Sequence, residues 1–282
     1  MSTITLPDIL APQSVDRRPV FRLFDHALPR EPASAPDRNV LQRSMFGIIK
    51  TAGHVLSRMS TRPGYRPAIS AAIRAELDPM LRPGDILFTR KEHAVTNYFL
   101  PGYWPHSALY LGDAATLVSL GIDELDHIRH RWSRIAAAER DDPRRVLEAM
   151  KDGVHIRPLQ SPMNCDSVVL VRPRLDRDEI ATALARGLLH EGKPYDFDFD
   201  FSRSDCLVCT EVVYRSYRGL GNIRFRLRRR ARRLTLTTDD LLRMALEGRG
   251  FEVIAAYLPT RSAELCAGAE ADTVVDDALA GA

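Results

Sequence analysis

Two segments, distant in the chain, carry residue types that together could form a thiol nucleophile and its base. In Cys-Leu-Val-Cys-Thr-Glu-Val-Val-Tyr, the second cysteine, Cys209, opens an apolar pattern with helical spacing. Far upstream, His106 opens the strand-like apolar run His-Ser-Ala-Leu-Tyr-Leu-Gly. A thiol attacks a carbonyl only as the thiolate, and its pKa falls at a helix N-terminus and beside a histidine. The pattern therefore predicts Cys209 as the nucleophile and His106 as its base.

A carboxylate that orients the base would complete such a site. Glu148 lies inside the apolar segment Val-Leu-Glu-Ala-Met. A buried carboxylate needs a partner, so an inward-facing Glu148 would hold the imidazole and stabilise its protonated form. A solvent-facing Glu148 would have no such role. Strand alternation alone leaves both orientations open.

The Cys-x-x-Cys pair formed by Cys206 and Cys209 has two other interpretations, a redox couple or half of a metal site. No second pair exists, because Cys165 and Cys266 stand alone in the sequence. No thioredoxin-like βαβ pattern precedes the pair. We therefore expect Cys206 to be a packed neighbour, or a thiol that protects Cys209 through reversible oxidation. No metal or other cofactor is expected.

Composition limits the classes of function. The chain has 282 residues, 45% of them hydrophobic, and a formal net charge of +3, so it can bury a core and has no overall signature of polyanion binding. Specific nucleic-acid binding is not expected. Four cysteines in so long a chain favour reduced thiols. Neither a secretory signal nor a long uncharged apolar stretch occurs, which predicts a cytoplasmic protein, with peripheral membrane contact and signal-less export left open.

The elements that must position these residues follow from composition and periodicity. Residues 1–40 are rich in Pro, Arg, Asp and Ser and predict a disordered leader. Apolar residues from Leu41 to Met59 recur on one helical face, so residues 41–82 are expected to form a helical extension that packs either on the domain or on a membrane surface. The compact domain is expected at 83–258. The small, acidic residues 259–282 predict a disordered tail.

Within the domain, short strand patterns alternate with few helices. Strands are expected around Ile86, at 106–112 and at 251–257. Three more are expected between them, at Val146–Met150, Val154–Ile156 and Val168–Val171. Helices are expected at 177–191 and 209–217. This segregation predicts an α+β class with a mostly antiparallel sheet packed against the helix that carries the cysteine. The charged stretch 122–143 is expected to be a surface insertion.

Residues Arg224–Arg233 form the strongest charge run in the chain. One interpretation is a solvated helix or loop. The other is an electrostatic contact with an anionic membrane surface or another polyanion. The sequence leaves both open.

Taken in order, several of these blocks carry a family resemblance: Gly-Asp-Ile-Leu-Phe88, the His106 strand, the Glu148 strand, Gly-Lys-Pro-Tyr-Asp-Phe197 and the Cys209 helix. This order resembles the circularly permuted branch of the NlpC-type papain-like superfamily, the YiiX/YebB-like hydrolases. The resemblance covers 83–257 and implies a permuted papain-like fold with a triad of Cys209, His106 and Glu148. It also implies that the loop with Tyr195 and Asp196 lines the cleft. We expect these two residues and Thr210 to contact the substrate.

The predicted function is a cysteine hydrolase, an amidase or peptidase with acyl transfer as an open variant, that works through a thioacyl-enzyme. The resemblance implies a peptide, a small amide or an acyl lipid as substrate. Two other classes of function remain open at this point. A catalytically idle papain-like binding module is one, and a thiol-redox protein that uses Cys206 and Cys209 is the other.

Overall fold

The computed structural model describes residues 65, 69–94, 103–137, 143–196, 201, 205–230 and 233–281. The predicted leader and the predicted amphipathic face from Leu41 to Met59 lie outside the described residues. The described part of the predicted helical extension forms the α-helix α3 (Ala71–Leu77) and the 3-10 helix η2 (Asp78–Met80). The Ser70 side chain caps α3 by accepting a hydrogen bond from the Ile73 N–H at 3.1 Å.

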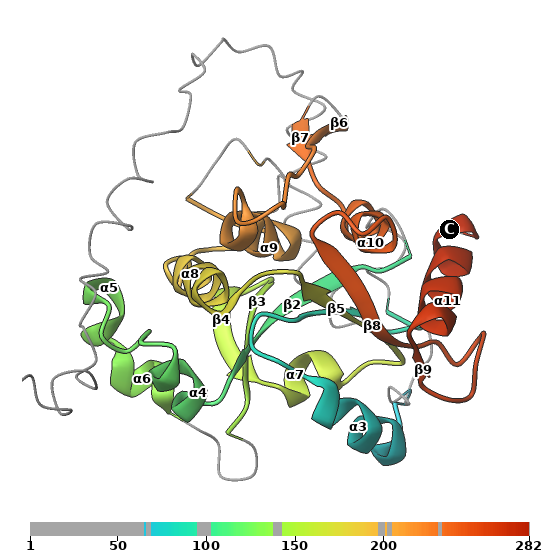
Figure 1. Cartoon of the computed structure of the whole chain (residues 1–282), viewed down its shortest axis with the longest axis horizontal. Helices are drawn as coiled ribbons and strands as arrows, with labels where there is room; N and C mark the ends of the chain where they lie inside the picture. The colour runs from blue at the N-terminus through green and yellow to red at the C-terminus, as the bar shows by residue number, and fades with distance from the viewer. Residues whose placement is uncertain are drawn as a thin grey trace, which may run out of the picture. The chain divides into compact units, whose positions relative to one another are not determined.

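A seven-stranded sheet forms the centre of the described structure, with the order β4-β3-β2-β1-β5-β8-β9 (Figure 1). All neighbouring strands are antiparallel. The strands are β1 (Ile86–Arg90), β2 (His106–Gly112), β3 (Arg145–Met150), β4 (Gly153–Pro158), β5 (Ser167–Pro173), β8 (Phe251–Tyr257) and β9 (Cys266–Ala267). This antiparallel sheet and the segregation of helices from strands confirm the predicted α+β class.

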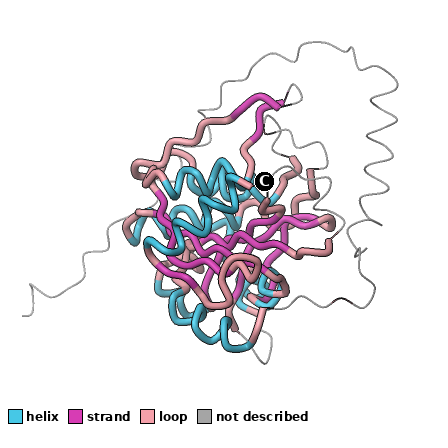
Figure 2. The backbone as a smooth tube through the Cα atoms, turned by 90° about the vertical axis from the view of Figure 1, so that its right-hand side faces the viewer, coloured by secondary structure: helices cyan, strands magenta, loops and turns pink. Residues whose placement is uncertain are grey.

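Both faces of the sheet are covered, as the tube view shows with helices on either side of the strand layer (Figure 2). On β1, Ile86 and Phe88 belong to one core cluster and Leu87 to the other, and each is at most 1% exposed. A strand buried on both faces reads as a continuous apolar run, which explains why β1 shows no polar alternation. The larger core contains side chains of α8 (Arg177–Leu188), α9 (Cys209–Tyr217), α10 (Thr238–Leu246) and α11 (Ala269–Ala280). The smaller core contains side chains of α3 and α7 (Gln160–Met163).

The two helices nearest the predicted nucleophile begin and end close to the predicted positions. Asp176 and Glu179 form a capping box that starts α8, and the helix ends at Leu188, before the predicted end at 191. The helix α9 has the predicted bounds.

Among the described residues, no helix combines the length and the apolar character needed to cross a membrane.

The stretch 122–143, predicted as a surface insertion, packs on the main core in its described part. It contains the short helices α5 (Asp126–Arg129) and α6 (Trp132–Ala136), preceded by α4 (Ala114–Ser119). Ile122, Ile128 and Ile135 are each at most 1% exposed and belong to the larger core cluster. These isoleucines attach an otherwise charged segment to the domain, because each removes a large apolar side chain from water.

The C-terminal segment differs from the predicted disordered tail. Strand β9 pairs with β8, and α11 follows it along the edge of the sheet (Figure 1). One stripe of α11 is buried, consisting of Ala271, Val275, Ala278 and Leu279. These positions repeat with helical spacing, so small residues provide a packing face that the overall acidic composition concealed.

The described residues of the arginine run do not form a helix. They comprise an irregular stretch and a short antiparallel hairpin, β6 (Arg228–Arg230) and β7 (Arg233–Thr235), which form a separate two-stranded sheet. Phe225, at the start of this segment, packs its ring 5.5 Å from that of Tyr214 on α9. The run is therefore anchored to the larger core through an aromatic side chain that lies between its arginines.

Candidate active site

Cys209 is the first residue of α9. Val208 is the N-cap, with an extended backbone, and its carbonyl accepts hydrogen bonds from the N–H groups of Glu211 at 3.0 Å and Val212 at 3.2 Å. No side chain caps this helix end. The first N–H groups of a helix have no partners within the helix, and the helix dipole favours negative charge there. The thiol of Cys209, 8% exposed, therefore lies where backbone N–H groups stabilise an anion.

His106 and Glu148 lie on adjacent strands and on the same face of the sheet. Glu148 on β3 is directly opposite Ala108 on β2, two residues beyond His106. Side chains of opposed residues project to the same face, and residues two apart on a strand share that face. The register therefore places the two side chains diagonally, and His106 Nε2 is 2.7 Å from Glu148 Oε2.

Glu148 is held in its ionised form by three side chains. Burial, to 1% exposure, favours the neutral carboxyl, but His106, Ser161 and Arg157 together lower its pKa below the usual value. The Ser161 hydroxyl, on α7, donates a hydrogen bond to Oε1, and Arg157 Nε on β4 is 3.4 Å from the same oxygen. A buried carboxylate with these partners can orient the imidazole and stabilise its protonated form.

His106 also interacts with the thiol of Cys209. Because Nε2 contacts Glu148, Nδ1 is the ring nitrogen left for the sulfur. Burial by itself would lower the pKa of His106, but its hydrogen bonds to Cys209 and Glu148 and their negative charges raise that pKa to about 10. Burial would raise the pKa of Cys209, but the hydrogen bond and the charge of His106 lower it. Both directions favour a thiolate and imidazolium pair.

Ser107, next to the base in sequence, adds support that sequence reasoning missed. Its backbone and its side chain both lower the pKa of the Cys209 thiol by hydrogen bonding. The Ser107 hydroxyl is buried and makes no hydrogen bond of ordinary geometry among the described residues, so its effect on the pKa of Cys209 is smaller than that of the Ser107 backbone. The sequence signal for this role of Ser107 was its position next to His106 on β2.

The structure places the three residues predicted to contact substrate, Tyr195, Asp196 and Thr210, in different surroundings. Tyr195 lies near Cys209: burial, and then the charges of Cys209 and Asp196, raise the pKa of Tyr195 well above the usual value. Thr210 is buried, with 6% exposure, in the first turn of α9. Tyr195 is half-buried and forms an isolated parallel bridge with Leu207, so its chain segment runs beside the residues that lead into α9.

Asp196 is more deeply buried than Tyr195. It is 1% exposed and lies near Glu211, whose pKa burial raises to about 7, with Arg215 lowering it and Asp196 raising it further. Tyr195 and Asp196 are adjacent in an extended segment, so their side chains point in opposite directions. Asp196 therefore lies in a buried charged group with Glu211 and Arg215 of α9, and its contact with substrate stays a prediction.

Cys206 has a different environment from Cys209. It precedes α9, is 7% exposed, and its sulfur is 3.9 Å from Asp205 Oδ1. All four cysteines are present as thiols, and the described residues contain no group of three or more His, Cys, Asp and Glu side chains able to hold a metal. A neighbouring carboxylate opposes thiolate formation, so Cys209 has the more suitable surroundings for a nucleophile.

We expect Glu148→Gln to reduce the activity of the site without disrupting the strand pair. Glutamine keeps an acceptor oxygen for His106 but removes the negative charge, so the pKa of His106 falls and the pKa of Cys209 rises. The expected loss in kcat/KM is roughly tenfold to a thousandfold. Steady-state rates across pH measure it, and the acid limb should move to higher pH. Ser161→Ala is the milder comparison, because it removes one hydrogen bond and leaves the carboxylate charged.

Comparison with known proteins gives one family match. Residues 80–271 match the model of a family described as permuted papain-like amidase enzymes, YaeF/YiiX, C92 family. Searches of curated proteins and of solved structures gave no match. The matched range contains β2, β3 and α9, and hence His106, Glu148 and Cys209.

Proposed function

Because the chain belongs to the family of permuted papain-like amidases, we propose that it is a cysteine hydrolase in which Cys209 is the nucleophile, His106 the base and Glu148 the orienting carboxylate. One observation carries the proposal. His106 lies between the thiol and a buried, ionised carboxylate, with Nε2 2.7 Å from Glu148 and its other side toward Cys209. This is the relation that a thiol nucleophile, its base and the third group require.

The reaction starts from the thiolate and imidazolium pair. The sulfur attacks the carbonyl carbon of an amide, a C–S bond forms, and the carbonyl oxygen takes the negative charge. The backbone N–H groups at the start of α9 are the donors available to that oxygen. When the C–N bond breaks, the imidazolium of His106 gives its proton to the leaving amine.

Deacylation reverses the roles of the same groups. His106, now neutral, takes a proton from water, the resulting hydroxide adds to the thioester carbonyl, and the C–S bond breaks to release a carboxylic acid. The departing thiolate pairs again with imidazolium. An amine or alcohol that replaces water in this step receives the acyl group instead, so acyl transfer uses the same residues.

The substrate is proposed as an amide, with an ester as the chemically related alternative. Three kinds of compound fit the proposal: a peptide, a small amide or an acyl lipid. Tyr195 is the residue best placed to border the acyl group, because it is half-buried near the Cys209 sulfur. We propose a cytoplasmic location, with contact at a membrane surface as part of the hypothesis.

Covalent trapping tests the proposal directly. The full-length chain is incubated briefly with panels of amides, activated esters and acyl lipids, and intact-mass measurements followed by peptide mapping locate any adduct. We expect an acyl adduct on Cys209 that disappears with time as water releases it. The Cys206→Ser variant should form the same adduct. An adduct on Cys206, or none with any substrate that the protein turns over, would refute the thioacyl mechanism.

A further inference from the structure

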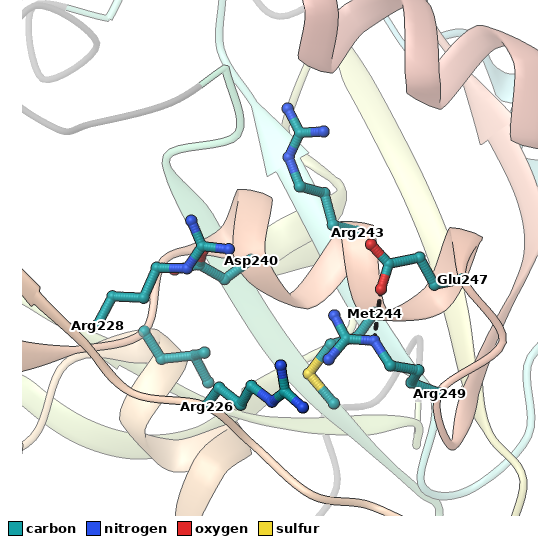
Figure 3. Close-up of a pocket in the computed structure, with 8 residues that line it drawn as sticks. Arg226, Arg228, Asp240, Arg243, Met244, Glu247 and Arg249 are labelled. Carbon is teal, nitrogen blue, oxygen red and sulfur yellow. Dashed lines mark ion pairs between the residues drawn. The ribbon is translucent and has the colours of Figure 1, made fainter.

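A hollow of about 270 Å³ lies between α10 and the described residues of the arginine run (Figure 3). Its lining includes none of Cys209, His106 and Glu148. Four arginines, two carboxylates and two apolar side chains line it: Arg226, Arg228, Arg243, Arg249, Asp240, Glu247, Leu236 and Met244. The arginines come from the charge run, from α10 and from the turn that follows α10. The fold therefore brings together positive charges that the sequence keeps apart.

The carboxylates in the hollow do not balance its arginines. Arg249 Nε is 2.5 Å from Glu247 Oε2, and Arg228 Nε is 3.5 Å from Asp240 Oδ1. Arg226 forms no ion pair with any carboxylate in the described part of the chain. The lining residues keep an excess of two positive charges. Such an excess within one concave surface attracts an anion.

The directions of the side chains define where that anion would lie. In Figure 3, the guanidinium groups of Arg226 and Arg249 approach each other beside Met244, whereas Arg243 turns away. Arg243 Nη2 instead contacts the Leu279 carbonyl of α11 at 3.5 Å. Glu247 already balances part of the charge of Arg249 through Nε, whereas Arg226 has no carboxylate partner among the described residues. An anion in the hollow would therefore pair first with Arg226 and could also reach Arg249 on the side away from Glu247.

We propose that this hollow binds the phosphate group of a phosphate ester. Guanidinium groups bind phosphate oxygens with paired, charge-assisted hydrogen bonds, and two of them here face a common space. Leu236 and Met244 border the hollow but are each only 2% exposed, so the phosphate group would provide most of the contact and the esterified part little of it. The volume of about 270 Å³ is slightly below the range of drug-sized sites, about 300 to 1,000 Å³, and so fits only a headgroup or a small soluble ester.

The elements that form this hollow also support the residues near the candidate active site. The Thr238 hydroxyl on α10 donates a hydrogen bond to the carbonyl of Trp104, two residues before His106. The Phe201 N–H donates to the Leu234 carbonyl of β7 at 3.2 Å. A phosphate ester bound there would occupy a wall shared with the catalytic elements. Binding itself requires no turnover, so this inference stands or fails independently of the thioacyl mechanism.

Paired substitutions test the site. Titration calorimetry on the full-length chain measures binding of inorganic phosphate and glycerol 3-phosphate, and cosedimentation uses phosphatidylcholine vesicles with and without phosphatidic acid. We expect R226Q/R249Q to weaken phosphate binding by on the order of a hundredfold, since each arginine contributes a charge-assisted contact worth about tenfold. A headgroup ligand predicts that vesicle binding falls in parallel. A soluble ligand predicts glycerol 3-phosphate binding without vesicle binding.

The matched control removes the same charge elsewhere. R224Q/R129Q changes two exposed arginines that do not line the hollow, and it should leave phosphate affinity near that of the unchanged protein. Thermal unfolding of both double variants verifies folding. Equal losses in the two double variants, or binding of only long polyanions such as heparin, would show diffuse surface attraction and overturn the proposal. Failure of the unchanged protein to bind any of the phosphate probes would overturn it as well.

Discussion

Replacing Cys209 by alanine is expected to abolish turnover, with a loss in kcat/KM of at least about 10⁴-fold on any substrate that the unchanged protein hydrolyses. The sulfur is the atom that forms the covalent bond in the proposed reaction. His106 and Glu148 have no second nucleophile to activate once it is gone. Purified variant and parent are compared on the same substrate, and intact-mass measurement verifies that the acyl adduct is absent.

The fold of this variant should survive, because alanine at the first position of α9 keeps the helix and removes only one buried atom. Cys206→Ala is the matched control, since it removes the neighbouring buried thiol and should retain most of the activity. Full activity in Cys209→Ala would exclude the proposed nucleophile. Equal inactivation of both variants would favour a dithiol mechanism instead.

Replacing His106 by alanine is expected to lower turnover by about 10²-fold to 10⁴-fold and to raise the pKa of the Cys209 thiol. Burial already opposes the thiolate, and the imidazolium outweighs that effect in the intact site. Without His106 the cation is lost and the burial remains, so the pKa moves upward. Iodoacetamide alkylation of Cys209, followed by mass spectrometry across pH, should show fast reaction well below pH ~8.5 in the parent and a shift to higher pH in the variant.

His155→Ala provides the comparison for this experiment. His155 lies on β4, directly opposite Glu148 but one strand further from β2, and its Nε2 is 3.0 Å from the Asp152 carbonyl. Its removal should leave the pH dependence of Cys209 alkylation unchanged. A parent protein whose thiol reacts only near pH ~8.5, with no change in His106→Ala, would indicate a catalytically idle module.

The start of a helix at Cys209 and of a strand at His106 could be predicted because their signals are local. Cys209 stands where a polar stretch changes to the apolar stripe of α9, and His106 opens an apolar strand. The direction of Glu148 was not predictable, since alternation along β3 allowed either face. The register that pairs Glu148 with Ala108 decides it, and register depends on contacts between strands distant in sequence. No local pattern pointed to Ser161, which reaches Glu148 from α7.

Composition did not predict the structure of the acidic C-terminal segment or of the arginine run. It concealed the buried stripe of α11, because two alanines, one valine and one leucine provide a packing face within an otherwise acidic segment. It also presented the arginine run as one linear feature. The structure divides that run and joins Arg226 and Arg228 with Arg249, which follows α10. A linear charge count cannot show which arginines converge, because tertiary packing determines that.

The diagonal contact between His106 and Glu148 also has a consequence for folding. These residues are 42 positions apart, and Cys209 lies much further along the chain, so the site depends on contacts of long sequence separation. Such contacts form late, after the entropic cost of closing long loops has been met. The unfolded or partly folded chain would carry an ordinary, slowly reacting thiol. In the proposed mechanism, Cys209 would therefore become a reactive nucleophile only after β2, β3 and α9 have assembled.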